Sequence, residues 1–309
     1  MLILEGRRFI ESTFVSEEEL EQVVVDHAEL IFGPSAIYFP KKLISTADGA
    51  GTVPDGYVID VAESRWYIVE AELDRHGVWR HIAPQVAKQI IAATNPASRQ
   101  LLVDLAVTRL KEEPALLEQL EEQDIAEIDV RKVLGRILES DPIVGMPIDK
   151  VRSDLREWAQ TLRVPVKLWE VRKYEEFGNS GNVIYELPEE YRPTLDTIEP
   201  RAESRSMARY DITLSDLLEA DLLAAGEVLE MPYKPRGGER KVYRASVVED
   251  GELEVLGKRF TSPSYAALLG IQDAGSSRTT VNGWVAWRNK RGRSLADLRE
   301  EYLASDSSI

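Results

Sequence analysis

The most constraining stretch of this chain is residues 66–72, where an apolar segment ends in Glu70 and Glu72. In an extended strand alternate side chains share a face, so Glu70 and Glu72 continue the apolar face that begins at Trp66. The other face is apolar as well, which indicates a strand buried on both sides. Carboxylates on an apolar face are unfavourable unless they are paired, protonated or bound to a cation. The stretch therefore predicts a strand that presents two acids to a divalent metal ion.

A third acid, Asp55, lies between Pro54 and Gly56 at the start of the preceding apolar segment. Pro54 biases the residue before it toward extended geometry, and Gly56 permits a sharp turn. We therefore expect the Asp55 carboxylate to project at the mouth of a hairpin. Hard oxygen ligands of this kind suit Mg²⁺ or Mn²⁺. The predicted metal ligands are Asp55, Glu70 and Glu72.

These acids resemble the motifs of the PD-(D/E)XK nuclease superfamily. Pro54 and Asp55 match its first motif, and Glu70 and Glu72 match the second, with Glu72 at the usual Lys position. The resemblance implies a mixed sheet flanked by helices and an acidic cluster whose metal ion serves phosphodiester cleavage. Some members carry an acid at the Lys position, which leaves the general base open, and Lys88 is a candidate for part of the missing positive charge. The alternative is an exposed strand end with solvated acids.

A predicted helix precedes this stretch. Ser16 and Glu19 form a capping pair, and apolar residues then recur at helical spacing. The superfamily places an acid on its first helix beside the metal, and this resemblance assigns that role to Glu21. Glu19 is assigned to capping, and the alternative for Glu21 is a solvated helix charge.

A second predicted helix follows the strand and opens at Pro84, a residue favoured at the first helical position. Gln85 and Gln89 lie one turn apart on it. Related nucleases often have a Gln there, and we favour Gln85 as the supporting residue. The alternative is that both amides line a polar face.

Composition limits the chemistry that the chain can carry. Its 309 residues suffice for two domains, and the absence of cysteine excludes disulfides, thiol catalysis and Cys-ligated metal sites. Of the three histidines, His27 is expected in the core, whereas His76 and His81 flank the predicted site and are candidates for phosphate contact. No apolar run is long enough to span a bilayer and the start lacks a signal-peptide core, so we expect a cytoplasmic protein without a membrane partner.

The formal net charge of −16 argues against a generic nucleic-acid binder. The charge is unevenly distributed, however, because residues 258–293 hold seven Lys or Arg and one acid, Asp273. We therefore expect a basic surface in the C-terminal part that can recruit DNA, while metal ions reverse the local charge of the N-terminal part.

Periodicity and turn residues predict an α/β domain over residues 1–188, a linker over residues 189–207 that is rich in Pro, Glu, Arg and Ser, and a smaller α+β domain over residues 208–309. In the first domain the predicted strands are 36–44, 53–73, 141–146, 164–171 and 182–187, with a turn at 178–181. The predicted helices after the first are 84–94, 114–120, 125–138 and 148–162.

Four pieces follow the linker: a leucine-rich helix that runs from Leu214 to a stop at Gly226, a hairpin about an Asp-Gly turn, residues 261–267 and residues 281–287. In this order, over about residues 212–303, they resemble the RAMA domain, named for association with restriction enzymes and adenine methylases. Such domains are regarded as readers of modified DNA and occur fused to nucleases. The resemblance therefore implies a modified-DNA reader.

Several side chains in the last two pieces suit DNA contact. A serine can cap a helix whose N-terminus attracts phosphate, an indole can stack on an exposed base, and Asn282 can pair with an adenine or cytosine edge. Trp284 and Trp287 are close enough in sequence that at least one is expected in the core, and the basic run could equally be a solvated loop. The predicted DNA-binding residues are Ser262, Ser264, Tyr265, Asn282, Trp284, Trp287, Arg288, Lys290 and Arg291.

The two resemblances together imply a modification-dependent, Mg²⁺-requiring DNA endonuclease that serves in defence against modified foreign DNA. Its partner would be double-stranded DNA that carries a modified base, and we expect a homodimer because one site cuts one strand. A non-cleaving reader or adaptor, and a repair nuclease for branched or damaged ends, are the alternatives. The predicted catalytic residues are Asp55, Glu70, Glu72, Glu21 and Gln85.

Overall fold

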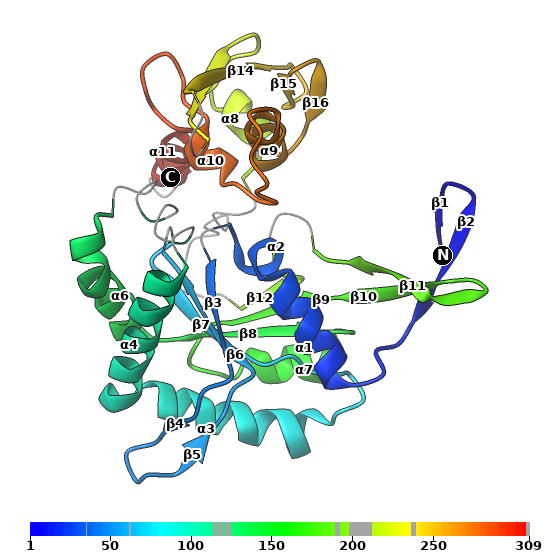
Figure 1. Ribbon diagram of the computed structural model, residues 1–309, viewed down its shortest axis with the longest axis vertical. Helices are drawn as coiled ribbons and strands as arrows, with labels where there is room; N and C mark the ends of the chain where they lie inside the picture. Colours follow the sequence, from blue (N-terminus) through cyan, green and yellow to red (C-terminus); the bar gives the residue numbers. More distant parts are fainter. Residues whose placement is uncertain are drawn as a thin grey trace. The chain divides into compact units, whose positions relative to one another are not determined.

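The computed structural model describes residues 1–34, 36–61, 63–113, 116, 120, 125–188, 192–197, 212–235 and 239–306 (Figure 1). The chain divides into two compact units, Met1–Glu199 and Pro200–Ile309. Within the described ranges, no helix combines the length and the apolar composition that crossing a membrane requires.

A six-stranded mixed sheet organises the first unit, in the strand order β12-β9-β8-β7-β6-β3. β7, β8 and β9 run parallel, and the other neighbours pair antiparallel. Helices connect β7 to β8, as a parallel pair requires, so the predicted α/β class with a mixed sheet is confirmed. The strands are β3 (Ala36–Pro40), β6 (Gly56–Asp60), β7 (Arg65–Val69), β8 (Ile143–Ile148), β9 (Val166–Glu170) and β12 (Leu195–Asp196).

Helices cover both faces of this sheet. Successive side chains of β7 point to opposite faces, so they pack against different helices. Trp66 and Ile68 pack with α3 (Ala83–Ala93), α4 (Pro96–Glu112) and α6 (Val130–Glu139). Tyr67 and Val69 pack on the other face with α1 (Glu17–Asp26) and α2 (Ala28–Phe32). The prediction of a strand buried on both sides is therefore confirmed.

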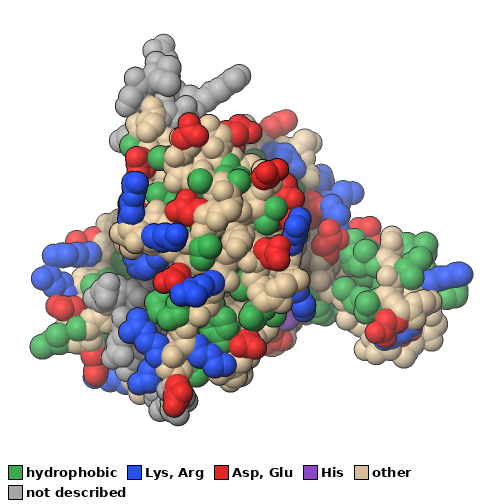
Figure 2. Space-filling model, turned by 90° about the horizontal axis from the view of Figure 1, so that it is seen from above, with side chains coloured by type: hydrophobic (Ala, Val, Ile, Leu, Met, Phe, Trp, Pro, Cys, Tyr) green, Lys and Arg blue, Asp and Glu red, His purple; other side chains and the backbone are tan. Residues whose placement is uncertain are grey.

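A four-stranded sheet that the sequence patterns only partly predicted projects from the six-stranded one (Figure 1). It consists of β1 (Leu2–Leu4), β2 (Arg7–Ser12), β10 (Arg172–Glu176) and β11 (Asn179–Glu186). Apolar side chains gather on this projection in Figure 2. Its exposed apolar residues include Ile3 in β1, Ile10 in β2 and Phe177 between β10 and β11. β11 begins inside the predicted turn at 178–181, because Gly178 alone supplies the positive φ that reverses the chain. β4 (Ile44–Ser45) and β5 (Gly51–Thr52) form a separate short ladder.

Three further boundaries in the first unit differ from the predicted ones. The 17-residue α4 has no predicted counterpart, because apolar residues surround this helix instead of forming one stripe. α7 (Ser153–Ala159) is shorter than the predicted 148–162, since Ile148 still pairs with Glu170 in the sheet. The predicted 125–138 helix is a short 3₁₀ turn, η2 (Glu127–Asp129), followed by α6. Most of the helix predicted at 114–120 lies outside the described residues.

The predicted linker also contains part of the sheet. Leu195–Asp196 form edge strand β12 against β9, and the Thr197 hydroxyl accepts a hydrogen bond from the Val166 N–H at 2.5 Å. Lys167, a buried lysine of β9, pairs with Asp196 at 3.2 Å. Residues 192–197 therefore belong to the first unit, and the rest of the range 189–207 lies outside the described residues.

The second unit is a smaller α+β fold, as predicted, built on an antiparallel sheet in the order β13-β14-β15-β16. Its strands are β13 (Val228–Tyr233), β14 (Lys241–Val247), β15 (Leu253–Val255) and β16 (Lys258–Phe260), and its helices are α8 (Leu214–Glu219), α9 (Pro263–Asp273), α10 (Gly283–Ala286) and α11 (Leu295–Asp306). The Asp-Gly turn joins β14 to β15 as predicted. α8 ends seven residues before Gly226, because Asp221 takes a positive φ and turns the chain.

Candidate functional site

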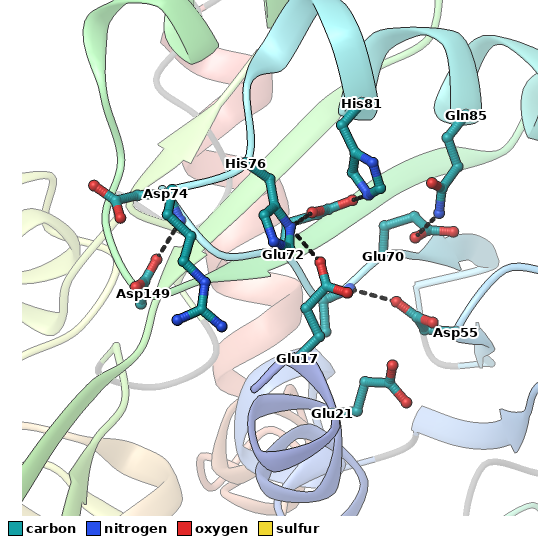
Figure 3. Close-up of polar contacts among 12 residues, drawn as sticks. Glu17, Glu21, Asp55, Glu70, Glu72, Asp74, His76, His81, Gln85 and Asp149 are labelled. Carbon is teal, nitrogen blue, oxygen red and sulfur yellow. Dashed lines mark hydrogen bonds and ion pairs between the residues drawn. The ribbon is translucent and has the colours of Figure 1, made fainter. Parts of the chain in front are cut away.

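The ends of neighbouring strands bring the predicted acids of the first unit together (Figure 3). Asp55 immediately precedes β6 and Glu70 immediately follows β7, and the register pairs Gly56 with Val69. The backbone N–H groups of Glu70 and Glu72 donate to carbonyls of β8, both at 3.0 Å, so the chain stays extended beyond β7. This continuation keeps both glutamate side chains on the face that α3 covers.

Asp55 is held by a backbone donor and by a lysine. Its Oδ2 accepts a hydrogen bond from the Ala71 N–H at 3.0 Å, and its Oδ1 lies 3.2 Å from the Lys41 Nζ. The Tyr38 hydroxyl donates to the Asp55 carbonyl at 3.1 Å. Gly56 is required by this contact rather than by a sharp turn: its φ is not positive, and an added Cβ would overlap the Tyr38 ring and hydroxyl.

Glu70 is 1% exposed and is held by two amides of α3. The Gln85 side-chain N–H donates to one carboxylate oxygen at 2.7 Å, and the Gln89 side-chain N–H donates to the other. Burial, followed by the nearby charge of Asp55, raises the pKa of Glu70 to about 9. Without a cation, this carboxyl group is therefore protonated at neutral pH.

Glu72 meets a different set of partners, which include two histidines. It is 1% exposed, and its carboxylate lies 3.3 Å from the His76 Nδ1 and 3.8 Å from the His81 Nε2. Glu17, in the first turn of α1, lies 2.5 Å from the same His76 nitrogen. Burial and the neighbouring Glu17 raise the pKa of Glu72 to about 9. We call Glu17, Glu72, His76 and His81 the Glu72–histidine cluster.

Glu21 lies beside Asp55, and one lysine joins the two. Lys41 Nζ is 2.7 Å from a Glu21 oxygen, and burial, with the charge of Asp55, raises the pKa of Glu21 although Lys41 opposes the shift. Lys88, the predicted source of positive charge, is exposed on α3, and its charge acts on Asp48 in a loop. Lys41 is therefore the cation beside the predicted metal ligands.

Three of the residues gathered here, Glu17, Lys41 and Tyr38, were not predicted. Glu17 lies four positions before Glu21, hence on the same face of α1. Lys41 directly follows the strand that pairs with β6, which is the signal that could have found it. Tyr38 has no distinguishing pattern in the sequence. Gln85 was predicted as the supporting residue, and both Gln85 and Gln89 contact Glu70.

Two groups of side chains could therefore hold a cation. Asp55 and Glu70, which we call the Asp55–Glu70 site, offer carboxylate oxygens that suit Mg²⁺. In the Glu72–histidine cluster, one donor atom of each residue lies within 4.8 Å of the others. Glu72 was predicted to act with Asp55 and Glu70, whereas its side chain contacts Glu17, His76 and His81.

In the second unit, the start of α9 and the start of α10 meet. Ser262 is buried and caps α9 by accepting a hydrogen bond from the Tyr265 N–H at 3.3 Å. The Ser264 hydroxyl accepts from the Gly283 N–H at 3.2 Å. Glycine is required at position 283, because an added Cβ would overlap the backbone of Pro263. This packing brings Ser264, Tyr265 and Asn282 to one place on the unit.

Both predicted tryptophans belong to the core, which corrects their proposed role in base stacking. Trp287 is fully buried, and its indole N–H donates to the Pro263 carbonyl at 3.0 Å. Trp284 is 4% exposed, and the Arg299 guanidinium lies 4.7 Å from its ring centroid. Stacking on a base needs an exposed ring face, which neither indole offers. Tyr265, 43% exposed, does offer one.

The remaining predicted DNA-binding residues lie at a tight basic turn and beside α10. The Asn289 side chain accepts from the N–H groups of Arg291 and Arg293, at 3.0 and 3.1 Å, and this fixes the turn. Lys290 and Arg291 are exposed on it and form no ion pair with any described residue, whereas the Arg288 guanidinium donates to the Gly292 carbonyl. The Asn282 Oδ1 is buried and accepts no hydrogen bond within the described ranges.

Comparison with known proteins supports the C-terminal assignment. The family model RAMA, described as Restriction Enzyme Adenine Methylase Associated, matches residues 194–308. The predicted resemblance of the C-terminal part is thereby confirmed, and the RAMA family is one that relates to restriction–modification systems. The match begins at residue 194, although the structure places Leu195–Asp196 in the sheet of the first unit. No curated protein matches the chain.

Proposed function

We propose that this chain is a modification-dependent DNA endonuclease, in which the first unit cleaves and the RAMA part reads. The observation that carries the proposal is the pair of carboxylates, Asp55 and Glu70, held together at the ends of adjacent strands. The similarity of the second unit to RAMA domains favours DNA as the substrate. The pair of carboxylates could bind the metal ion that phosphodiester hydrolysis requires.

The donor set of the Asp55–Glu70 site fits Mg²⁺ or Mn²⁺. Its ligands are oxygens, and each Glu70 oxygen that accepts one amide N–H retains a further lone pair. The raised pKa of Glu70 shows that a bare carboxylate is unfavourable there, which a dication would reverse. A bound Mg²⁺ would lower the pKa of its water and offset charge on the phosphate.

The surrounding residues orient these ligands. Gln85 and Gln89 fix both oxygens of Glu70, and the Ala71 N–H fixes Asp55. Glu72 stands where the superfamily usually has a lysine, and Lys41 supplies the positive charge instead. When DNA is bound, we assign the Lys41 side chain to contact with the scissile phosphate. Glu21 restrains Lys41, and Glu72, whose side chain contacts His76 and His81, is not assigned to this site.

We assign recognition of the modified base to Tyr265 and Asn282. Phosphate contact is assigned to the N-terminus of α9 and to the turn that carries Lys290 and Arg291. The N-terminus of an eleven-residue helix and exposed cations both favour phosphate. Phosphate contacts position a protein, whereas base contacts specify the site. Cleavage restricted to marked DNA would spare an unmarked host genome, which suits a role in defence.

The deciding experiment incubates the full chain with modified and unmodified duplexes, in Mg²⁺ or in EDTA, beside the Asp55→Asn variant. We expect cleavage of modified DNA only, dependent on Mg²⁺ and reduced on the order of 100-fold or more in the variant, because a ligand is lost. Glu157→Gln, which changes an exposed acid on α7, is the control and should cleave normally.

The other outcomes identify the alternatives. Modified-DNA binding without cleavage under any metal would indicate a reader or adaptor. Preference for branched or damaged ends regardless of modification would indicate a repair nuclease.

A further inference from the structure

The Glu72–histidine cluster draws its donors from three segments. Glu17 begins α1, Glu72 follows β7, and His76 lies in the loop before η1 (Val78–Ile82), a single π-helical turn that carries His81. The Glu72 side chain forms a buried floor, whereas the two histidine side chains reach solvent, at 29% and 48% exposed. Figure 3 shows the rings of His76 and His81 both pointing toward the Glu72 carboxylate. The cluster is therefore open to small solutes from its histidine side.

The donor atoms of the cluster are close to the spacing that one metal ion imposes. All four lie within 4.8 Å of one another. Four donors bound tetrahedrally to one ion at about 2.0–2.2 Å lie about 3.3–3.6 Å apart. Side-chain shifts of about 1 Å would therefore bring these groups into a single coordination shell.

The charges of the cluster also call for a cation. Glu17 and Glu72 face each other, and the ion-pair partners of Glu72 within the described part of the chain are the two histidines. Two acidic side chains this close to each other favour a cation between them. Lys41, which follows β3, is engaged with Asp55 and with Glu21, one turn of α1 beyond Glu17.

We propose that Glu17, Glu72, His76 and His81 bind a transition-metal dication of the Zn²⁺ class, at a site separate from the Asp55–Glu70 site. Imidazole nitrogens suit Zn²⁺ and related ions, whereas Mg²⁺ prefers oxygen ligands. The proposal also gives a reason for the acid at the superfamily's Lys position, because Glu72 is the floor of this second site. It does not depend on nuclease activity.

The test is a calorimetric titration of metal-free full-length protein with Zn²⁺ in excess Mg²⁺. We expect one Zn²⁺ per chain, and Asp55→Asn should retain this binding because Asp55 is not one of the four ligands. His76→Gln and His81→Gln should each weaken Zn²⁺ binding about 100-fold or more. The third histidine, His27, ends α1 outside the cluster, so His27→Gln is the matched control and should bind as the wild type does.

A second measurement needs no variant. The chain has three histidines, so its imidazole NMR spectrum contains three sets of signals. Zn²⁺ should shift two of them at one equivalent and leave that of His27 unchanged, while Mg²⁺ should shift none by direct ligation. Unaltered imidazole signals at saturating Zn²⁺, or Zn²⁺ binding that survives in the His76→Gln/His81→Gln double variant, would overturn the proposal. In that case the cluster is a hydrogen-bonded network without metal.

Discussion

Glu70 and Glu72 are acids whose environment opposes their ionisation. Both have an ordinary pKa of 4.5 and a folded pKa of about 9. A carboxyl group with a raised folded pKa contributes stability that is fully present below pH 4.5 and is lost as the pH rises toward 9. The two groups interact, so the effect belongs to the pair rather than to either residue.

We therefore predict that metal-free wild-type protein loses unfolding free energy between pH 4.5 and 9, on the order of a few kcal/mol. Glu70→Gln/Glu72→Gln, which cannot ionise at these positions, should show a flatter profile and at high pH should be the more stable protein. Denaturant unfolding in EDTA across this range measures both. Parallel profiles for the two proteins would contradict the buried, ionisation-resistant state of the pair.

Tyr265 and Arg291 should differ in what they contribute to DNA binding. Tyr265→Ala removes an exposed ring at the start of α9 and should weaken binding of modified duplex by ~1–3 kcal/mol, with less effect on unmodified duplex. Arg291→Ala should weaken both duplexes alike and flatten the salt dependence. Fluorescence anisotropy at several salt concentrations distinguishes the two patterns. Phe177→Ala, which removes an exposed ring from the first unit, is the control; equal losses in it and in Tyr265→Ala would argue against a reading role.

At the scale of the elements, the pairing of β3 with β6 positions the predicted metal ligand Asp55. The Tyr38 ring passes over Gly56 to reach the Asp55 carbonyl, and any side chain at position 56 would occupy that path. We predict that Gly56→Ala lowers stability by roughly 1–3 kcal/mol and reduces cleavage, because the tyrosine and with it Asp55 must move.

Gly135→Ala provides the comparison for that variant. Gly135 lies inside α6, and in the described structure no neighbouring group comes within 4 Å of an added Cβ. Alanine should therefore stabilise α6 by up to about 1 kcal/mol and leave cleavage unchanged. Thermal unfolding and cleavage rates of the two variants test the argument, and it is wrong if Gly56→Ala behaves as Gly135→Ala does.

For the whole molecule, the position of β12 decides where the chain can be divided. A fragment of residues 1–199 keeps β12 on β9, whereas a fragment of residues 1–190 removes it together with Asp196, the partner of buried Lys167. We predict that 1–199 folds with the higher melting temperature and cuts weakly without regard to modification. Residues 200–309 should bind modified duplex and cut nothing. If the isolated C-terminal fragment folds yet binds both duplexes equally, the reader assignment fails.

The number of cleavage sites bears on assembly. The first unit holds one Asp55–Glu70 pair, so a double-strand break needs two protomers or two successive events. We predict a homodimer on DNA, detected by sedimentation, and double-strand products whose rate rises with more than the first power of protein concentration. A monomer both free and on DNA, with rates first order in protein, would contradict this arrangement.

The sequence by itself determined the features that depend on local periodicity and on a few costly residues. The alternation of residues 66–72 gave a strand buried on both faces, and the acids at its end could be recognised because a carboxylate on an apolar face demands an explanation. The Ser16 cap and the Asp-Gly hairpin follow from backbone chemistry within four residues. The order of four short pieces sufficed for the RAMA resemblance.

Only the tertiary structure decided which partners those acids meet. Glu72 contacts His76 and His81 because the chain doubles back through η1, and Lys41 reaches Asp55 because β3 pairs with β6. The burial of Trp284 and Trp287 and the pairing of β12 were likewise settled by packing against distant segments. The physical reason is common to all of them: side-chain periodicity fixes which face a residue occupies, whereas contact across the sheet depends on the register and crossover of strands far apart in the chain.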